Sequence, residues 1–480
     1  MSPLWRNHTG NQSCNPSEIA HPASLQDLVE LVRRAEADGR TVRAAGARHS
    51  WSDIALTEGV MVEPDGLAFV ERADPASLTA AAQGRDLVWV GAGTHLHELN
   101  AKLDHMGLAL SNMGGYDAQT IAGVISTSTH GSGLAFGPFP DAVRSLELVV
   151  AGGRALRLEP TDGPTDPRGF AAEGLELVKD DERFAAAICG LGTLGLLYAV
   201  QLEVREKFWL KEVRTLDTWE RVRGELSPEG VLGEPGHYEL FVNPYAGEDG
   251  EHRLLVTRRT DTSEPGHLPQ DKLERHPLTE LEASWHFTGV LLRFLARHFP
   301  RLVAGRFDDT LAGMCDDDYT NVSYNVFNIG EANKLPAYSM ELGIAVDGRH
   351  VEAVDRILAL AAERAGEGLW HTSPFSLRFV APSRAYASMM YDQPTMMIEL
   401  IMVAGSRGGI ALLEGYEEAL EDLGVRPHWG QVNALGPERP SQLYPKWSSW
   451  LAAEREYNAS GVFDSPFTRR VGISQLAERS

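Results

Sequence analysis

The glycine-rich stretch CGLGTLG at residues 189–195 constrains the fold more than any other feature of this sequence. Gly190, Gly192 and Gly195 satisfy the G-x-G-x-x-G pattern of dinucleotide-binding folds, in which the loop follows a strand and opens a helix. Here the order is reversed: DDERFAAAI before it has helical composition, and VQLEV at 200–204 alternates like a strand. The stretch therefore favours a tight helix-to-strand turn over a Rossmann domain and a nicotinamide-dependent enzyme.

The first hundred residues predict short strands and helices in quick succession rather than regular βαβ units. Ser24-Leu-Gln-Asp27 is a capping box for a helix that ends near Asp38. The other predicted elements are strands at 41–45, 60–63 and 86–93 and a helix at 95–107. This order is typical of an α+β domain.

The chain is long enough for two or three domains, since it has 480 residues. Beyond Val204 it becomes richer in charge and proline, as expected where a second domain begins. Within that part, 350–366 predicts an amphipathic helix and 393–405 a buried strand.

The net charge of −23 argues against nucleic acid or an anionic membrane as a partner, because both require a basic face. No apolar run approaches the length of a membrane span, and the N-terminus lacks the order of a signal peptide. Cys14, Cys189 and Cys315 are far apart, with no metal-ligand spacing. We therefore expect a cytoplasmic protein without a metal site.

Three stretches could carry chemistry. AAGARHSWSD (44–53) places a glycine turn before adjacent arginine and histidine, and RPHWGQ (426–431) places a polar cluster beside a glycine. Between them, TIAGVISTSTHGSG (120–133) offers small hydroxyl side chains and exposed backbone N–H groups that suit phosphate oxygens. Taken alone, this stretch is equally compatible with a polar loop between strands.

Together and in this order, these stretches resemble the vanillyl-alcohol-oxidase superfamily of flavoproteins, and most closely its branch of sugar-1,4-lactone oxidases and alditol oxidases. The resemblance spans nearly the full length and rests on residues 46–53, 129–133, 190–195, 428–430, 443–445 and 461–463. It implies an α+β fold with a two-subdomain FAD-binding domain (1–205) and an α+β substrate (cap) domain with a large antiparallel sheet (206–424). The C-terminal segment 425–480 is expected to return to the FAD-binding domain.

The resemblance further implies FAD as the cofactor, with its pyrophosphate in the 46–50 loop and its 8α-methyl carbon bonded covalently to His49. Such a bond needs a neutral imidazole as the nucleophile. The cofactor-binding residues that it implies are Gly46, Ala47, Arg48, His49, Ser50, Gly114, Gly115, Thr120, Gly123, Ser126, Ser128, Thr129, His130, Gly133, Gly192, Gly195 and His428.

The sequence departs from this family at two substrate-site positions. PFSLRFVAP keeps Arg378 but has Ser376 where the family has glutamate, and Gln431 stands where it has lysine. Flavin reduction places negative charge near N1, and a glutamine donates only a neutral hydrogen bond to it. Arg378 is expected either to stabilise that charge or to bind an acidic substrate group.

The apparent loss of the glutamate favours a larger or less hydroxylated substrate than a sugar lactone or an alditol, and it requires another base. His371 and Tyr324 are the candidates, and Glu341 and Glu399 lie in strand-like runs.

The expected reaction is hydride transfer from a CH–OH carbon of a small or secondary-metabolite substrate to flavin N5. The resemblance places Gly114 and Gly115 beside the flavin, where in this superfamily a small side chain can admit O₂, so reoxidation by O₂ to give H₂O₂ is expected. The alternatives are a dehydrogenase with another electron acceptor, oxidation of a CH–NH carbon, or a flavin-retaining binding protein without redox turnover.

Overall fold

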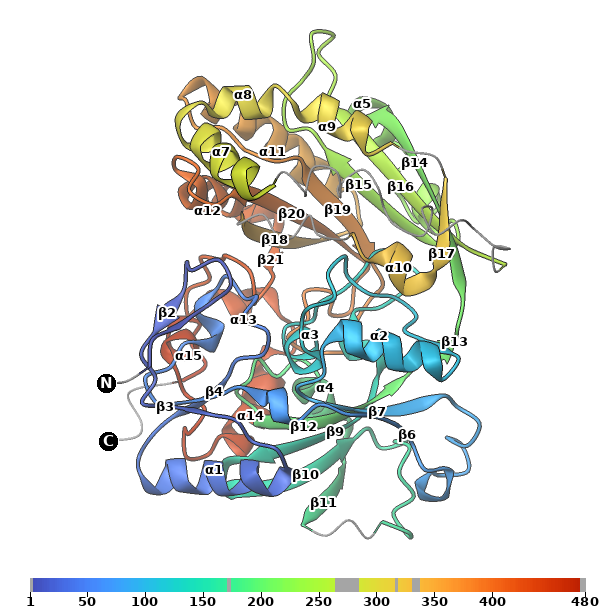
Figure 1. The fold of residues 1–480 in the computed structure, drawn as a ribbon, viewed down its shortest axis with the longest axis vertical. Helices are drawn as coiled ribbons and strands as arrows, with labels where there is room; N and C mark the ends of the chain where they lie inside the picture. The colour runs from blue at the N-terminus through green and yellow to red at the C-terminus, as the bar shows by residue number, and fades with distance from the viewer. Residues whose placement is uncertain (1–2, 171–173, 264–284, 316–317, 330–336, 475–480) are drawn as a thin grey trace.

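Two lobes, each built on a β-sheet, make up the computed structural model, which describes residues 3–170, 174–263, 285–315, 318–329 and 337–474 (Figure 1). The lower lobe contains a six-stranded sheet of order β11-β10-β9-β12-β7-β6 and a three-stranded parallel sheet of order β3-β5-β4. The upper lobe contains an eight-stranded antiparallel sheet of order β17-β14-β16-β15-β19-β20-β18-β21. The α+β fold class, with its large antiparallel sheet, is thereby confirmed.

The lower-lobe strands are β3 (Glu18–Ala20), β4 (Val42–Ala44), β5 (Val60–Val62), β6 (Val70–Arg72), β7 (Leu87–Gly91), β9 (Val143–Val150), β10 (Arg154–Glu159), β11 (Leu175–Lys179) and β12 (Leu196–Glu203). Two further two-stranded sheets pair β1 (Trp5–Arg6) with β2 (Ser13–Cys14) and β8 (Leu108–Ala109) with β13 (Arg205–Glu206). The helices of this lobe are α1 (Leu25–Ala37), α2 (Leu96–His105), α3 (Ile121–Ser126), α4 (Asp181–Ala187), α13 (Arg439–Leu443), α14 (Trp447–Tyr457) and α15 (Pro466–Arg470).

Half of the predicted capping box is present at the start of α1. The Ser24 hydroxyl accepts a hydrogen bond from the Asp27 N–H at 3.1 Å, which satisfies one of the donors that a helix start leaves free. The Asp27 carboxylate accepts from the Ala23 N–H at 2.9 Å, one residue before the position that the box requires. The apolar stripe of α1 then packs into the core between the two sheets.

The stretch 189–195 is a turn between α4 and β12, so the prediction of a helix-to-strand turn is confirmed. Leu191 and Gly192 adopt positive φ angles of 52° and 67° within it. The fully buried Arg43 of β4 holds the turn, donating from Nη2 to the Leu191 carbonyl and from Nη1 to the Gly192 carbonyl at 2.9 and 2.8 Å. A second strand of the lobe thus fixes the geometry of the loop.

The upper-lobe strands are β14 (Trp209–Thr218), β15 (His237–Val242), β16 (Arg253–Thr262), β17 (Tyr319–Val322), β18 (Ala337–Ala345), β19 (Phe375–Val380), β20 (Thr395–Val403) and β21 (Arg426–Pro427). Its helices are α5 (Trp219–Val222), α7 (Trp285–His298), α8 (Pro300–Ala304), α9 (Phe307–Gly313), α10 (Ser323–Phe327), α11 (Arg349–Gly366) and α12 (Gly409–Ala419). The apolar faces of α11 and α12 pack with the sheet in one core. Each strand and helix predicted by residue range is present, within a few residues at its ends.

The end of the chain lies against its beginning in the lower lobe (Figure 1). The Val42 N–H of β4 donates to the Val462 carbonyl at 2.6 Å, and the Trp450 indole of α14 donates to the Cys189 carbonyl at 3.1 Å. Among helices in the described ranges, none combines the length and apolar character needed to cross a bilayer.

Candidate active site

A small cavity of about 10 Å³ lies between the two lobes. The lower lobe contributes residues 112–115 and 131–132, and the upper lobe contributes His237, Glu239 and Arg378. The two lobes touch directly at its edge, where the Gly133 N–H donates to the Phe379 carbonyl at 2.5 Å. Gly114 and Gly115 of the lower lobe and Arg378 of the upper lobe, all predicted from the sequence as site residues, therefore line the same cavity.

A row of charged side chains crosses the upper sheet on the face toward this cavity. Neighbours in the row lie opposite each other in the antiparallel register or are offset by two residues, and both relations place side chains on one face of the sheet. The row runs Glu212 (β14), Arg259 (β16), Glu239 (β15), Arg378 (β19), Glu399 (β20) and Glu341 (β18).

Arg378 is the centre of this row. Its Nε donates to Glu239 at 2.8 Å and its Nη1 donates to Glu399 at 2.7 Å, while Glu341 lies 3.6 Å from Nη1. Arg259 bridges Glu239 and Glu212 in the same way, at 3.0 and 2.7 Å.

The charged side chains in the row shift one another's pKa values. Burial alone would raise the pKa of Glu239, but the guanidinium groups of Arg378 and Arg259 lower it to about 2. Burial disfavours the charged form of Arg378, yet its three glutamate neighbours raise its pKa above the ordinary value. Glu239 and Arg378 are therefore both ionised at neutral pH.

The position where the family has glutamate is occupied by Ser376, two residues before Arg378 on β19. The Ser376 hydroxyl donates to the Glu399 carboxylate at 3.3 Å. Because Glu399 lies opposite Ser376 on the neighbouring strand, the carboxylate reaches the site from β20 instead of β19. The sequence analysis expected a less hydroxylated substrate because a glutamate was missing from the site. A carboxylate is present there, so that reason no longer holds.

Glu341 connects the row to the lower lobe and to the C-terminal stretch. Its carboxylate lies 3.2 Å from the His130 Nε2 and accepts a hydrogen bond from the Gln431 amide at 3.2 Å. Its backbone carbonyl accepts from the His428 N–H at 2.8 Å. Burial lowers the pKa of His428 to about 4, so that imidazole is neutral. Thus His130, His428 and Gln431 come together around one carboxylate.

His49 lies in a group of aromatic side chains in the lower lobe. Its Nε2 is 3.1 Å from the Tyr116 hydroxyl, and its ring centroid is 4.7 Å from that of His8. Burial, reinforced by His8 and His95, lowers the pKa of His49 to about 4. At neutral pH the imidazole is uncharged, as a nucleophile must be.

The 46–50 loop packs closely on the start of α3. A Cβ on Gly46 would lie 2.0 Å from the Thr120 Oγ1, and this hydroxyl is buried without a hydrogen-bond partner in the described part of the chain. Near it, Gly131 faces Asn112 and Met113 so closely that a Cβ there would lie 2.3 Å from the Asn112 amide oxygen. Gly46 and Gly131 are therefore packed directly against protein atoms. The unpartnered Thr120 hydroxyl is the group here that fits a phosphate oxygen of FAD.

The remaining loop residues take different positions. Arg48, at φ 61°, forms an ion pair with Glu63. The Trp51 N–H, next to Ser50, donates to the Gly430 carbonyl at 2.7 Å, which joins the loop to the stretch containing His428.

The hydroxyl run after Thr120 is largely engaged with protein. The Ser128 hydroxyl lies 2.7 Å from that of Ser388, and the Ser126 carbonyl accepts from the Leu191 N–H at 3.2 Å. The carbonyls of Gly123 and Thr129 also accept hydrogen bonds from protein groups. Gly195, at φ 132°, packs its Cα against the carbonyl of Val149 in β9.

The two sequence-predicted bases lie apart from the charged row. His371 is fully buried and packs edge-on against Tyr416 of α12, with ring centroids 5.8 Å apart, and burial lowers its pKa to about 3. Tyr324 of α10 packs on the lower-lobe core, and burial together with Asp104 raises its pKa. The structure does not bring either side chain into contact with Arg378.

Sequence reasoning missed Glu239 altogether. A shared signal could have found it, because Glu239, Glu341 and Glu399 each stand alone in an apolar strand: YELF, MELG and IELI. A single carboxylate in a strand buried on both faces requires a charged or polar partner. Three such strands predict a common polar site.

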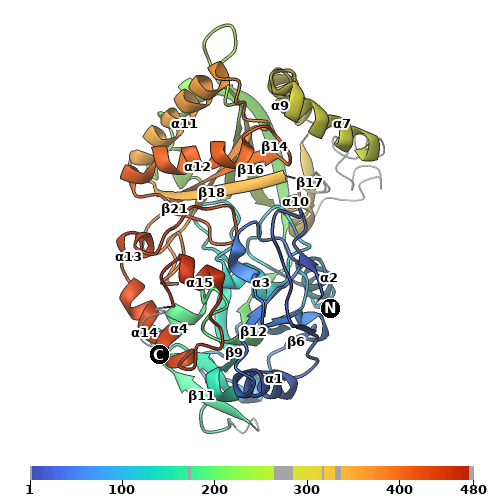
Figure 2. The ribbon, with the colours of Figure 1, turned by 90° about the vertical axis from the view of Figure 1, so that its left-hand side faces the viewer.

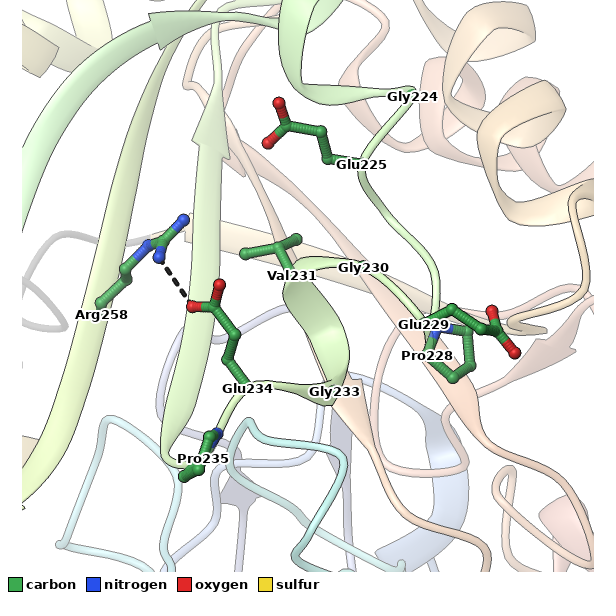
Figure 3. Close-up of a pocket in the computed structure, with 10 residues that line it drawn as sticks. All are labelled: Gly224, Glu225, Pro228, Glu229, Gly230, Val231, Gly233, Glu234, Pro235 and Arg258. Atoms are coloured by element: carbon green, nitrogen blue, oxygen red, sulfur yellow. Dashed lines mark hydrogen bonds and ion pairs between the residues drawn. The ribbon is translucent and has the colours of Figure 1, made fainter.

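A second pocket lies on the opposite face of the upper sheet (Figure 3). Arg258 lines it, and this residue points away from the face that carries Arg259 because side chains alternate along a strand. It forms an ion pair with Glu234 at 2.9 Å, and both side chains of this pair are solvent-exposed. This pocket is separate from the charged row. Among the described residues, no cluster of three or more histidine, cysteine, aspartate or glutamate side chains has the arrangement of a metal site.

Fold and site define the class of protein: an FAD-dependent oxidoreductase with the vanillyl-alcohol-oxidase architecture. Residues 16–159 match the family described as FAD binding domain, and residues 200–471 match the family described as D-arabinono-1,4-lactone oxidase. The chain belongs to the D-arabinono-1,4-lactone oxidase family.

Individual proteins support this assignment. The chain is 31% identical to an L-gulono-1,4-lactone dehydrogenase of Mycobacterium tuberculosis, over 98% of this chain and 99% of that protein. It is 28% identical to an alditol oxidase of a Streptomyces species, with the same coverage. A cholesterol oxidase of Brevibacterium sterolicum has the same fold, with a TM-score of 0.73 at 15% identity over 98% of this chain and 97% of that one.

Proposed function

We propose that this protein oxidises a hydroxyl-bearing carbon of a small polyhydroxylated substrate, of the sugar-lactone or alditol class, with O₂ as the electron acceptor. The observation that carries the proposal is the charged row around Arg378, which faces the lower-lobe glycines across the shared cavity. Ionised carboxylates and a guanidinium at one wall supply the acceptors and donors that substrate hydroxyl groups need. Relatives named for lactones and alditols agree with it.

Within the row, we assign substrate binding to Arg378 and Glu399. Their side chains are 13% and 15% exposed, whereas those of Glu239 and Glu341 are 4% exposed and serve as their fixed counter-charges. Arg378 donates to a substrate oxygen, and Glu399 accepts the hydrogen bond and then the proton of the hydroxyl that is oxidised.

Bound FAD supplies the hydride acceptor. Thr120 and the 46–50 loop would hold its phosphates, and residues 112–115 and 131–132 would lie beside it at the cavity. His130, His428 and Gln431 lie around Glu341 and would hold that residue in place. The neutral His49 imidazole, beside the Tyr116 hydroxyl, would be the residue that attaches the cofactor.

The cofactor part of the proposal is tested by acid precipitation of the purified protein. We expect the yellow colour to stay with the pellet in the wild type and to move to the supernatant in His49→Ala. Colour in the wild-type supernatant contradicts the covalent bond, and a protein that never binds FAD contradicts the cofactor assignment.

The reaction is tested by anaerobic mixing with alditols, aldono-1,4-lactones, an aliphatic alcohol and an amine. We expect the flavin absorbance to bleach with a polyol or a lactone, and Glu399→Gln to lower kcat/KM by about 100-fold or more with unchanged FAD content. Glu234→Gln, which changes an exposed ion pair, is the matched control. Bleaching by the amine or the aliphatic alcohol alone would overturn the substrate class.

The electron acceptor is a separate question, because one relative is named an oxidase and another a dehydrogenase. We favour O₂ because Gly114 and Gly115 line the cavity without side chains. Stoichiometric H₂O₂ formation in air supports this choice. Turnover with a dye but without O₂ consumption would instead show a dehydrogenase.

A further inference from the structure

His237 of β15 lines the cavity between the lobes and has one ring nitrogen without a protein partner. It lies opposite Arg259 in the register between β15 and β16, and therefore on the same face of the sheet as the charged row. It is 3% exposed. Its Nδ1 lies 2.7 Å from the Ser132 carbonyl oxygen, whereas Nε2 is buried without a hydrogen bond in the described part of the chain. Burial withholds bulk water from Nε2, so its partner has to be a group that enters the cavity.

Two phenylalanine rings hold the His237 ring in place. It stacks on Phe136, with ring centroids 4.4 Å apart and an angle of 5° between the planes. Phe327 meets it edge-on at 4.8 Å. Phe327 belongs to α10, which Figure 2 shows at the boundary between the two lobes. Nε2 therefore has a fixed position at this boundary.

The protonation of the ring makes Nε2 an acceptor. A carbonyl oxygen only accepts hydrogen bonds, so the contact with Ser132 requires the proton on Nδ1. Burial, reinforced by Arg259, lowers the pKa of His237 to about 4, and the ring carries no second proton at neutral pH. Nε2 therefore presents a lone pair, and only a group with an O–H or N–H can pair with it.

The surroundings of His237 identify the group that it binds. Gly114 and Gly115 line the same cavity from the lower lobe, and Arg378, to which we assign substrate binding, lines it from the upper lobe. The volume of about 10 Å³ has room for about one group of the size of a water or a hydroxyl. The cavity thus fits a single hydroxyl group of a molecule bound at Arg378.

We propose that the Nε2 of His237 accepts a hydrogen bond from one substrate hydroxyl, other than the one that is oxidised, and so makes this hydroxyl a requirement for fast turnover. The inference rests on the proposed function, because it needs a hydroxylated substrate beside Arg378. A site built to bind a hydroxyl rejects an analogue that lacks it, since a buried acceptor is then left unpaired. His237 thereby selects polyhydroxylated substrates over simple alcohols.

The test compares sorbitol and gulono-1,4-lactone with their singly deoxygenated forms. The measured quantity is the second-order rate constant of anaerobic flavin reduction in the FAD-loaded protein. For the parent compound that the wild type oxidises, we expect one deoxygenated form to react about 100-fold or more slowly. The ratio of these two rate constants is the hydroxyl discrimination.

His237→Phe removes Nε2 but keeps an aromatic ring between Phe136 and Phe327. The Ser132 carbonyl still accepts from the Asn112 amide at 3.2 Å, so it is not left unpaired. In this variant the parent compound and the discriminating deoxygenated form should react within about threefold of each other, because the hydroxyl has lost its partner. His237→Gln, whose amide oxygen is an acceptor, should keep part of the discrimination.

His350→Phe is the matched control. This buried histidine of α11 uses both ring nitrogens within the protein: Nε2 donates to the Leu226 carbonyl at 2.8 Å, and Nδ1 accepts from the Gly348 N–H at 3.2 Å. The control should keep the wild-type discrimination, and all variants should keep the wild-type FAD content.

Two results would overturn the proposal while leaving the proposed function intact. One is wild-type discrimination that persists in His237→Phe. The other is a wild type that reduces its flavin equally fast with every deoxygenated form, as it would if a water stayed bound at Nε2, and this result needs no variant. If neither parent compound bleaches the wild-type flavin, the proposed function fails and this inference fails with it.

Discussion

Glu239 is the shared counter-charge of Arg378 and Arg259, so one carboxylate stabilises two buried guanidinium groups. Glu239→Gln leaves two buried guanidinium groups with one carboxylate fewer. We expect the free energy of unfolding to fall by about 3 kcal/mol, measured by urea denaturation. Glu234→Gln, whose arginine partner is exposed, should cost less than about 1 kcal/mol. Equal losses in the two variants would contradict the role of Glu239.

The same carboxylate gives the protein a defined acid response. Its pKa is about 2 in the folded state, below the ordinary value of 4.5. A lowered pKa stabilises the folded state above pH 4.5, and this contribution is lost as the pH falls toward 2. The stability difference between wild type and Glu239→Gln should therefore shrink across that window. Urea unfolding at several pH values checks it, and a constant difference would exclude this ionisation as the cause.

At the scale of elements, the loop after β4 is held against α3 at the distance of van der Waals contact. Gly46→Ala would bring a methyl group 2.0 Å from the Thr120 Oγ1, so the loop and the helix must separate. We expect FAD affinity to fall at least tenfold, measured by flavin fluorescence titration in a His49→Ala background that reports non-covalent binding. Unchanged FAD affinity in Gly46→Ala would contradict this role of the loop–helix contact.

Gly415→Ala is the matched control for this change. Gly415 lies inside α12, and a Cβ there meets no atom within 4 Å. Its FAD affinity should equal that of the parent chain. A similar loss of affinity in both variants would mean that the close contact between Gly46 and Thr120 has no part in cofactor binding.

Elements were predictable from the sequence where their signals are local. The helix start at Ser24 and the alternation after Gly195 depend on neighbouring residues, and both were confirmed. The carboxylate partner of Arg378 was not predictable in this way, because it depends on the register between β19 and β20. The sequence of β19 alone, with Ser376 in place of a glutamate, suggested that a carboxylate is missing from the site. In the structure, Glu399 on the adjacent strand β20 lies opposite Ser376 and supplies a carboxylate.

At the scale of the whole molecule, the net charge of −23 should control which electron acceptors reach the flavin. An anionic acceptor such as ferricyanide is repelled at low salt, where the Debye length is about 30 Å, and much less at physiological salt, where it is about 8 Å. Raising the ionic strength over this range should therefore accelerate ferricyanide-dependent turnover by about 3–10-fold. A neutral quinone, which feels no such field, should react at a constant rate. Stopped-flow reoxidation of the reduced protein measures both, and a ferricyanide rate that falls with salt would show a basic entrance to the site inside an acidic molecule.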